Sequence, residues 1–278
     1  MKKYVVLLIL LACMYVYVQL NGNVEEVPVK PVLRVGVECD YVPNSWEEVK
    51  PSKSNVPISN QKGYYAEGYD IQIAKIVASE LGVTLEVKKI AWNDLLPSLN
   101  NGEIDAIFSS MLDTEERKKL ASFSEPYEVK KAEYGIIVDS VSPYITAKSL
   151  KDFDGARIVG EKGTKLDEVI DQIPGVIHLK PTAKVQGMID AVLRDEADGA
   201  VIDTDTGRYY ELTNKNLTLI EFPAGGGFEL GFTGVCAGVR KDDTELLHKI
   251  NIALEKISRS ERQKIMDTAT SRMMTNLQ

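Results

Sequence analysis

The sequence predicts an α/β protein. Its 278 residues are enough for one large or two modest domains, and the apolar and charged fractions are ordinary for a globular chain. Short apolar runs typical of buried strands alternate with stretches of helical period. Residues 104–108 are one such run, whereas residues 71–81 carry an apolar helical stripe that ends before Gly82, a natural residue for a helix C-terminus. The first part of the body therefore reads as a repeated β-α-β-α-β arrangement.

The charge pattern bears on the partner. The net charge is −8, and no basic block offsets the acidic excess, which argues against nucleic acid as a partner. No repeat period typical of a solenoid is present.

The N-terminus has the layout of an export signal, with two lysines before an apolar run at residues 4–20. The sequence Leu-Leu-Ala-Cys ending at Cys13 resembles a bacterial lipobox, in which the cysteine is lipidated. The residues after Cys13 stay apolar, and the run reaches the lower limit of about 17–25 residues for a spanning helix, so an uncleaved anchor is the alternative. We expect residues 1–23 to be a signal or lipoprotein anchor and residues 24–31 to be a linker. In either case the body lies outside the cytoplasm and is tethered to the membrane.

The most informative stretch is residues 104–127. Its apolar strand is followed by Ser-Ser-Met, and Thr114 then fits a helix N-cap with two glutamates after it. A cation in the first turn, Arg117, gains nothing from the helix dipole, so an anion in front of it would explain its position. The stretch therefore predicts a carboxylate site, with an ordinary surface arginine as the alternative.

This stretch resembles the amino-acid-binding proteins that feed ABC importers, the bacterial solute-binding proteins of family 3. The shared order is a strand, Ser-Ser-Met, T-x-x-R and F-S-E-P-Y. Further matches are G-Y-D-I at residues 68–71, L-K-D-F-D-G at 150–155, Gly-Thr at 163–164 and the final aspartate of 198–203. The resemblance covers about residues 32–270. It implies a two-lobed periplasmic-binding-protein fold of type II, with two hinge strands and the ligand in the cleft between the lobes.

The resemblance also implies the division of the chain. Lobe 1 is expected to be discontinuous, at residues 32–136 and 231–278, and lobe 2 to span residues 137–230. Apolar runs at residues 133–139 and 230–239 are the expected crossings. The segment 50–66 is rich in Pro, Ser, Asn and Lys and reads as a loop, either a lid or surface decoration.

In lobe 1, the family's ligand contacts map onto the ends of predicted strands. The segment with Arg117 is implied to hold the α-carboxylate and α-ammonium of an amino acid, and Leu112 stands where the family usually has Ser or Thr. Each candidate also has a structural alternative, as a packed aromatic or a solvated acid. The expected lobe 1 contacts are Glu38, Tyr41, Trp46, Trp92, Ser109, Ser110, Met111 and Arg117.

In lobe 2, a Gly-Thr pair between a strand and a helix exposes backbone N–H groups to an anion. The resemblance places Gly163 and Thr164 against the ligand carboxylate. Lys165 either joins that site or is solvated. Asp203 matches the family's ammonium-binding aspartate, with Asp205 as a neighbouring alternative.

These residues predict an α-amino acid ligand, and Glu38 favours a cationic or amide side chain, with glutamine and cystine left open. The resemblance implies an ABC permease and its ATPase as partners, and a monomer. No cofactor, metal ion or catalytic residue is expected. An aromatic-amino-acid dehydratase and a sensory subunit share the fold and are the alternatives. Cys39 and Cys236 are expected to be free, partly buried thiols rather than a disulfide.

Overall fold

The computed structural model describes residues 31–128, 133–230 and 234–275. The predicted export signal, its Cys13 and nearly all of the linker lie outside these ranges. None of the helices within them is long and apolar enough to cross a membrane.

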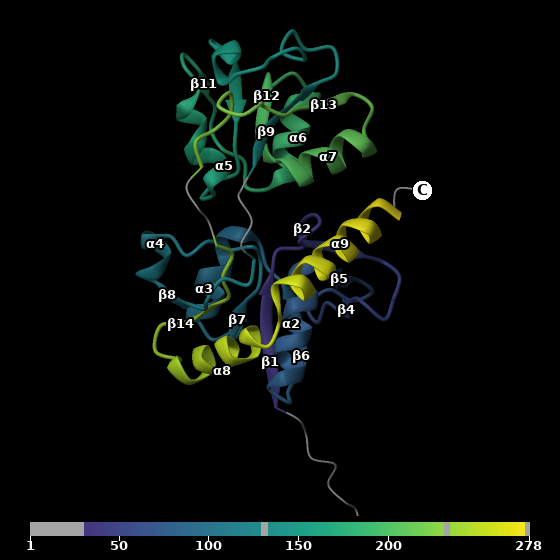
Figure 1. Cartoon of the computed structure of the whole chain (residues 1–278), viewed down its shortest axis with the longest axis vertical. Helices are drawn as coiled ribbons and strands as arrows, with labels where there is room; N and C mark the ends of the chain where they lie inside the picture. Colours follow the sequence, from purple (N-terminus) through teal and green to yellow (C-terminus); the bar gives the residue numbers. More distant parts are fainter. Residues whose placement is uncertain (1–30, 129–132, 231–233, 276–278) are drawn as a thin grey trace, which may run out of the picture. The chain divides into compact units, whose positions relative to one another are not determined.

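Lobe 1, as we use the term below, is built on a five-stranded sheet of order β6-β1-β7-β14-β8 (Figure 1). Strand β1 pairs in parallel with β6 and β7, whereas β14 pairs antiparallel with β7 and β8. Strand β14 comes from near the C-terminus, so both ends of the described chain contribute to this lobe. The strands are β1 (Val32–Val37), β6 (Thr84–Lys89), β7 (Ala106–Ile107), β8 (Ala121–Phe123) and β14 (Gly238–Arg240).

Helices α2, α3 and α8 pack on this lobe because each has apolar side chains to bury. Helix α2 contacts β6 and both C-terminal helices, and α3 contacts β1 and β7. Two helices, α8 and α9, lie near the C-terminus and are separated at residues 256–258. The lobe 1 helices are α2 (Tyr69–Glu80), the 3-10 turn η1 (Trp92–Asp94), α3 (Leu95–Asn100), α4 (Glu115–Lys118), α8 (Thr244–Glu255) and α9 (Arg259–Thr275).

A small antiparallel sheet of order β2-β3-β5-β4 completes lobe 1. Part of the segment 50–66 that we expected to be a loop forms its edge, and Ile58 makes a further bridge to Val87 of β6. That segment is therefore folded onto the body and lines no part of the site described below. The strands are β2 (Asp40–Tyr41), β3 (Ser45–Glu48), β4 (Val56–Pro57) and β5 (Tyr65–Glu67).

Lobe 2 is built on a second five-stranded sheet, of order β11-β10-β12-β9-β13. Its strands are β9 (Tyr134–Asp139), β10 (Arg157–Val159), β11 (Ile177–His178), β12 (Gly199–Asp203) and β13 (Leu217–Ile220). Its helices are the 3-10 turns η2 (Leu150–Phe153) and η3 (Val169–Gln172), and α5 (Lys165–Glu168), α6 (Val185–Leu193) and α7 (Thr204–Thr213).

The expected crossing at residues 133–139 is wrong. Strand β9 instead lies inside the second sheet, paired on one side with β12 and on the other with β13. The physical reason is that four successive buried residues, 135–138, need sheet neighbours on both edges and cover on both faces. In the expected return crossing, residues 231–233 lie outside the described ranges, and β14 at its end belongs to lobe 1.

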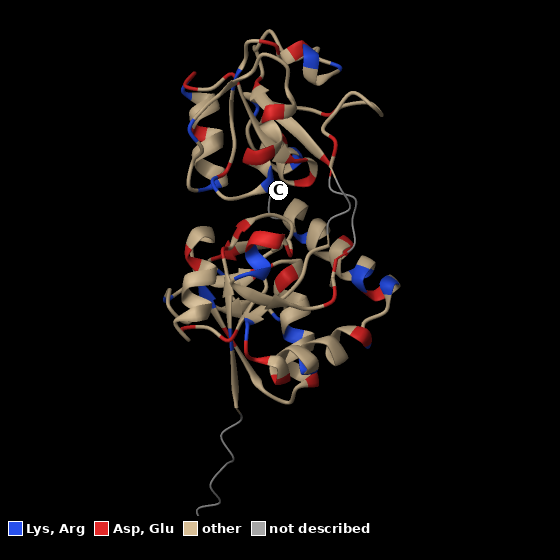
Figure 2. Ribbon diagram, turned by 90° about the vertical axis from the view of Figure 1, so that its left-hand side faces the viewer, with Lys and Arg blue, Asp and Glu red and all other residues tan. Residues whose placement is uncertain are grey.

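Each lobe has its own apolar core. The lobe 1 core centres on β1, α2 and the C-terminal helices, and the lobe 2 core on β9, β10, β12 and α6. The lobes also touch directly: the Thr206 hydroxyl of α7, itself buried, donates to the Val42 carbonyl at 2.7 Å. Acidic and basic side chains are interspersed along the described chain (Figure 2).

Helix α9 is fastened to the small sheet by a buried carboxylate. Glu67 is 3% exposed, and its Oε1 atom accepts hydrogen bonds from the Gly68 backbone N–H, the Gln72 amide and Arg272 of α9. The Arg272 Nη1 atom lies 3.2 Å from that oxygen. A buried charge is tolerated only when it is paired and hydrogen-bonded, so Arg272 compensates Glu67.

We expect Arg272→Ala to destabilise the protein by about 1–3 kcal/mol, because it leaves Glu67 buried without its cation. Chemical denaturation measures the loss. In the Glu67→Gln background the same change is expected to cost much less, because the charge to be compensated is gone. Arg259→Ala, at the exposed start of the same helix, is the matched control. Equal losses in both backgrounds would contradict the pairing.

Candidate ligand-binding site

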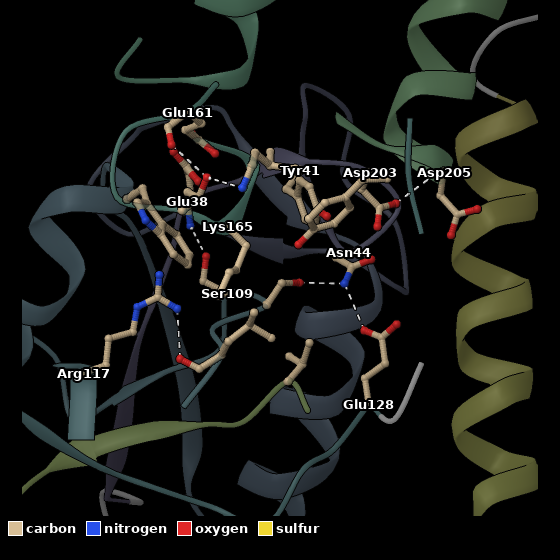
Figure 3. A pocket seen from close by; sticks show the side chains of 17 residues that line it. Glu38, Tyr41, Asn44, Ser109, Arg117, Glu128, Glu161, Lys165, Asp203 and Asp205 are labelled. Carbon is tan, nitrogen blue, oxygen red and sulfur yellow. Dashed lines mark hydrogen bonds between the residues drawn. The ribbon is translucent and has the colours of Figure 1, made fainter. Parts of the chain in front are cut away.

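A pocket of about 110 Å³ lies where two pairs of parallel strands end, β1 with β7 in lobe 1 and β10 with β12 in lobe 2. Ligands of open α/β sheets commonly bind at this edge. Figure 3 shows the side chains that surround it. The lining residues are Glu38, Tyr41, Asn44, Trp92, Ser109, Ser110, Leu112, Arg117, Glu128, Tyr134, Glu161, Thr164, Lys165, Leu166, Asp203, Asp205 and Val235.

The lobe 1 strands end in backbone conformations that aim their side chains at the pocket. Cys39 after β1 and Ser110 after β7 have φ values of 57° and 50°, in the left-handed region that residues other than glycine rarely adopt. The Glu38 backbone N–H donates to the Ser109 hydroxyl at 3.0 Å, which ties the two strand ends together. Glu38, Ser109 and Ser110 are thereby brought to one edge.

A polar network holds Ser110 in place. Its hydroxyl donates to Asp70 at 2.9 Å and accepts from the Asn44 amide at 2.6 Å, and Asn44 also donates to Glu128 at 3.1 Å. Asp70 is fully buried and accepts a second hydrogen bond from the Tyr127 hydroxyl at 2.7 Å. The Ser110 side chain therefore serves the architecture of the site.

Arg117 reaches both lobes. Its backbone N–H donates to the Thr114 hydroxyl, so Thr114 is the expected N-cap, although α4 is only one turn long. Its guanidinium donates to the carbonyl oxygens of Leu112 and Gly163, each at 2.9 Å, and lies 5.0 Å from the centre of the Trp92 ring. None of the described carboxylates forms an ion pair with Arg117, and burial lowers the pKa of its guanidinium. Such an arginine has unused capacity for an anion.

Gly163 is the point at which lobe 2 meets Trp92 and Arg117. Its carbonyl oxygen also accepts from the Trp92 indole N–H at 3.3 Å. The residue has φ of +73°, and a β-carbon there would stand 3.1 Å from the Asn93 side-chain oxygen. Glycine suits this position because it adopts a positive φ without strain and has no β-carbon to crowd Asn93. Gly163 takes part through its backbone and is not among the lining residues.

The next two residues of this loop are engaged within lobe 2. The Thr164 hydroxyl caps α5 by accepting from the Leu166 N–H at 3.2 Å and donates to the Glu161 carbonyl at 2.8 Å. Lys165 lines the pocket and forms an ion pair with Glu168. The helix expected after the Gly-Thr pair is a single α-turn, Lys165–Glu168, continued as a 3-10 turn, Val169–Gln172. A ligand role for Thr164 and Lys165 stays a prediction.

Asp203 ends β12 at the pocket and caps α7, where its carboxylate accepts from the Asp205 N–H at 3.0 Å. Asp205, its expected alternative, also lines the pocket, as does Tyr134 at the start of β9. Burial, followed by the nearby Asp203 charge, raises the pKa of the Tyr134 hydroxyl. This part of the site therefore has acceptors for a cationic group.

Two buried glutamates, one in each lobe, complete the site. Glu38 and Glu161 are 5% and 4% exposed, and the Oε1 atom of each has no hydrogen-bond partner among the described residues. Burial, together with nearby negative charge, raises the pKa of both carboxyl groups. The sequence did not indicate Glu161, whose signal is an acid two residues after the end of β10.

Two expected ligand contacts lie elsewhere. Trp46 packs in the lobe 1 core, and its indole N–H donates to Glu48 at 2.7 Å. Met111 is 1% exposed and packs against Leu95 and Leu99. Burial of these large apolar side chains in the lobe 1 core outweighs contact with a ligand. The sequence did not indicate four of the lining residues, Asn44, Glu128, Tyr134 and Leu166. The two cysteines of the described residues, Cys39 and Cys236, are free and buried.

Asp70 gives the site a measurable pH signature. Burial raises its pKa to about 7, so the folded protein keeps a proton that the unfolded chain, with an aspartate pKa near 3.9, has lost. Stability is therefore expected to fall as the pH rises from about 4 to 7. Asp70→Asn should remove about 1–4 kcal/mol of this pH dependence, as measured by denaturation across that range. Asp242→Asn, on the surface, is the control. An unchanged slope in Asp70→Asn would contradict the assignment.

The chain is similar in sequence to known binding proteins. Residues 33–270 match the sequence model of the bacterial extracellular solute-binding proteins, family 3. The arginine-binding extracellular protein of Bacillus subtilis (strain 168) is 26% identical over 261 residues, which cover 92% of this chain and 93% of that protein.

Two solved structures are also similar. An ancestral arginine-binding protein bound to arginine has a TM-score of 0.68 at 28% identity, with 86% of this chain and 98% of that chain covered. An ancestral amino acid-binding protein, a precursor of cyclohexadienyl dehydratase, has a TM-score of 0.68 at 26% identity, with coverages of 86% and 95%.

Proposed function

The chain belongs to the bacterial extracellular solute-binding proteins, family 3, and from that premise we propose that it captures a cationic L-amino acid, arginine first among them, for an ABC importer. The observation that carries the proposal is a pair of buried acids in the pocket lining. Glu38 and Glu161 each have a carboxyl oxygen without a hydrogen-bond partner among the described residues, and neither forms an ion pair with any of them. Buried carboxyl groups that lack a donor suit a ligand whose side chain ends in a cation with several N–H groups. The similar proteins named for arginine support the same choice.

The roles of the lining residues follow from their chemistry. Arg117 would bind the α-carboxylate, since a guanidinium donates two parallel hydrogen bonds to a carboxylate. Asp203 would receive the α-ammonium. Trp92 would cover the aliphatic stem of the ligand, and Glu38 would face the cationic end of its side chain. Ser109, Ser110 and Tyr41 would complete the lobe 1 wall and Thr164 the lobe 2 wall, while the Gly163 carbonyl would hold Arg117 in place.

Ligand contacts from both lobes would couple binding to hinge closure. A ligand that touches residues of both lobes binds the closed arrangement better and so shifts the population toward it. Lobe 1 at residues 32–136 and 231–278 and lobe 2 at 137–230 are the units we propose to move. The start of β9 at Tyr134 argues for placing the first boundary a few residues earlier.

We further propose that the protein acts as a monomer outside the cytoplasm. The lipobox-like sequence at Cys13 or an uncleaved apolar run would tether it to the membrane, where it would deliver its ligand to a permease driven by an ATPase. Family membership supports the extracytoplasmic placement.

A binding protein without catalytic activity is the preferred proposal over a dehydratase. The similarity to a precursor of cyclohexadienyl dehydratase favours the dehydratase, but that precursor is itself named an amino acid-binding protein. Glu133, an acid of the segment 133–139 that could serve such chemistry, is exposed and does not line the pocket. Release of a dehydrated product from a cyclohexadienyl substrate would decide for the enzyme.

The proposal is tested by a thermal-shift screen of the purified protein against the twenty amino acids, ornithine, citrulline and cystine. A ligand that binds only the folded state raises the melting temperature with its saturation. We expect arginine, lysine or ornithine to give the largest rise. A rise with apolar or acidic amino acids alone would contradict the proposal. To remove carried-over ligand, the screen is repeated after unfolding and refolding.

Arg117→Ala is expected to weaken binding of the ligand by about 2–5 kcal/mol, because the desolvated ligand carboxylate loses its partner. This corresponds to roughly a 30- to several-thousand-fold rise in Kd, measured by isothermal titration calorimetry. Arg194→Ala, at an exposed arginine of lobe 2 paired with Glu196, is the matched control and should bind normally. An unchanged Kd in Arg117→Ala would show that the anion site lies elsewhere.

A further inference from the structure

We propose that Glu161 and Glu38 form a proton-exchange site, at which the cationic side chain of the ligand replaces a proton that the two carboxyl groups hold in the free protein. Glu161 would then be a residue that determines specificity for a charged over a neutral side chain. The inference rests on the proposed function. It adds how the site selects a charged over a neutral side chain, and that binding of the charged one releases a proton.

The geometry brings one carboxyl group from each lobe to the same end of the pocket. Glu38 follows β1 and Glu161 follows β10, and Figure 3 shows their side chains next to each other. Both are buried, and each has an Oε1 atom without a partner among the described residues. Buried polar atoms are nearly always hydrogen-bonded, so two orphaned carboxyl oxygens lining one pocket indicate a missing donor.

The surrounding charges do not supply that donor. Among the described residues, neither glutamate has an ion pair, and Lys89, at the end of β6, is paired with Glu47 at 3.0 Å. Asp40 adds negative charge that raises the pKa of both glutamates, whereas Lys89 and Lys184 only partly offset it for Glu38. The titratable groups that face the pair are Asp40 of β2, Lys89 of β6, Lys184 before α6, Tyr210 of α7, Cys39 and Tyr41.

Two desolvated carboxyl groups close together cannot both ionise cheaply, so the free pair keeps a proton at neutral pH. Burial raises the pKa of each group, and the charge of Glu38 raises that of Glu161 further. A guanidinium has five N–H donors in a planar fork and can donate to both groups at once. As it binds, a carboxyl O–H bond breaks and the proton passes to the buffer, so the charge of the site stays balanced.

The sign of the pH effect follows from linkage. A bound cation stabilises the ionised carboxylates and lowers their pKa values, so protons are released on binding. Affinity for the cation therefore rises with pH across the range in which the free pair holds its proton, by at most about tenfold per pH unit for each proton released. A neutral side chain of the same shape would bind beside the protonated pair and release few or no protons.

The test compares L-arginine with L-citrulline, whose ureido group is neutral and of similar shape. Calorimetric titrations at pH 7 in two buffers of different ionisation enthalpy give the number of protons released on binding. For the wild-type protein we expect arginine to release about 0.5–1.5 protons, citrulline close to none, and arginine to gain affinity between pH 6 and pH 8.

Glu161→Gln keeps the shape of the side chain and removes one titrating group. We expect it to release fewer protons with arginine and to reduce the preference for arginine over citrulline by at least about tenfold, since one carboxylate partner of the cation is lost. Glu38→Gln should change both readings in the same direction. Glu255→Gln, at the exposed end of α8, is the matched control and should leave both unchanged.

The outcomes separate this inference from the proposed function. Arginine binding to the wild-type protein with the same enthalpy in both buffers would overturn the proton exchange, whether or not the variants fold. An unchanged preference for arginine in Glu161→Gln would overturn the specificity role. Absence of binding by every amino acid would overturn the proposed function, and this inference with it.

Discussion

The site depends on a constraint of the backbone: parallel strands deliver their carboxyl ends to one edge of a sheet. In lobe 1 the left-handed conformations at Cys39 and Ser110 turn the chain as soon as β1 and β7 end, and the bond from Glu38 to Ser109 joins the two turns. In lobe 2 the ends of β10 and β12 present Glu161 and Asp203 in the same way. Without these convergent strand ends the lining residues, which come from across the sequence, would share no surface.

The second feature of the pocket is that its two buried glutamates are held differently from the other buried acids of the chain. On the lobe 1 side, hydrogen bonds from Tyr127 and Ser110 satisfy Asp70, and Asn44 donates to Ser110. Glu67 and Arg272 show how the same protein treats a buried carboxylate with a structural task, by giving it a cation and two further donors. Glu38 and Glu161 lack such a cation among the described residues. That contrast within one chain distinguishes a carboxylate kept for architecture from one kept for a ligand.

Much of this arrangement was predictable from sequence. Arg117 stood out because a cation in the first turn of a helix has no local reason to be there, and Thr114 is the cap that the sequence suggested. Helix α2 followed from its apolar period. Glu161 and Glu128 were not predictable, because a single acid after a short strand reads as a solvated loop residue until the second lobe is placed beside it. Trp46 and Met111 show the opposite error: their chemistry suits a ligand, but packing against the core decides where such side chains lie. The segment 133–139 was misplaced because an apolar run predicts a strand and not the sheet that will receive it.

Leu112 shows why a departure from a family pattern does not by itself empty a site. The residue stands where a hydroxyl is usual, and its side chain brings only apolar surface to the pocket. Its carbonyl oxygen, however, holds one arm of Arg117, and the carbonyl of Gly163 holds the other. Backbone carbonyls thus fix the orientation of the guanidinium without neutralising its charge, since neither carries a formal negative charge. An arginine oriented in this way is preorganised for an anion, and a bound carboxylate would gain hydrogen bonds from a group that needs little further ordering.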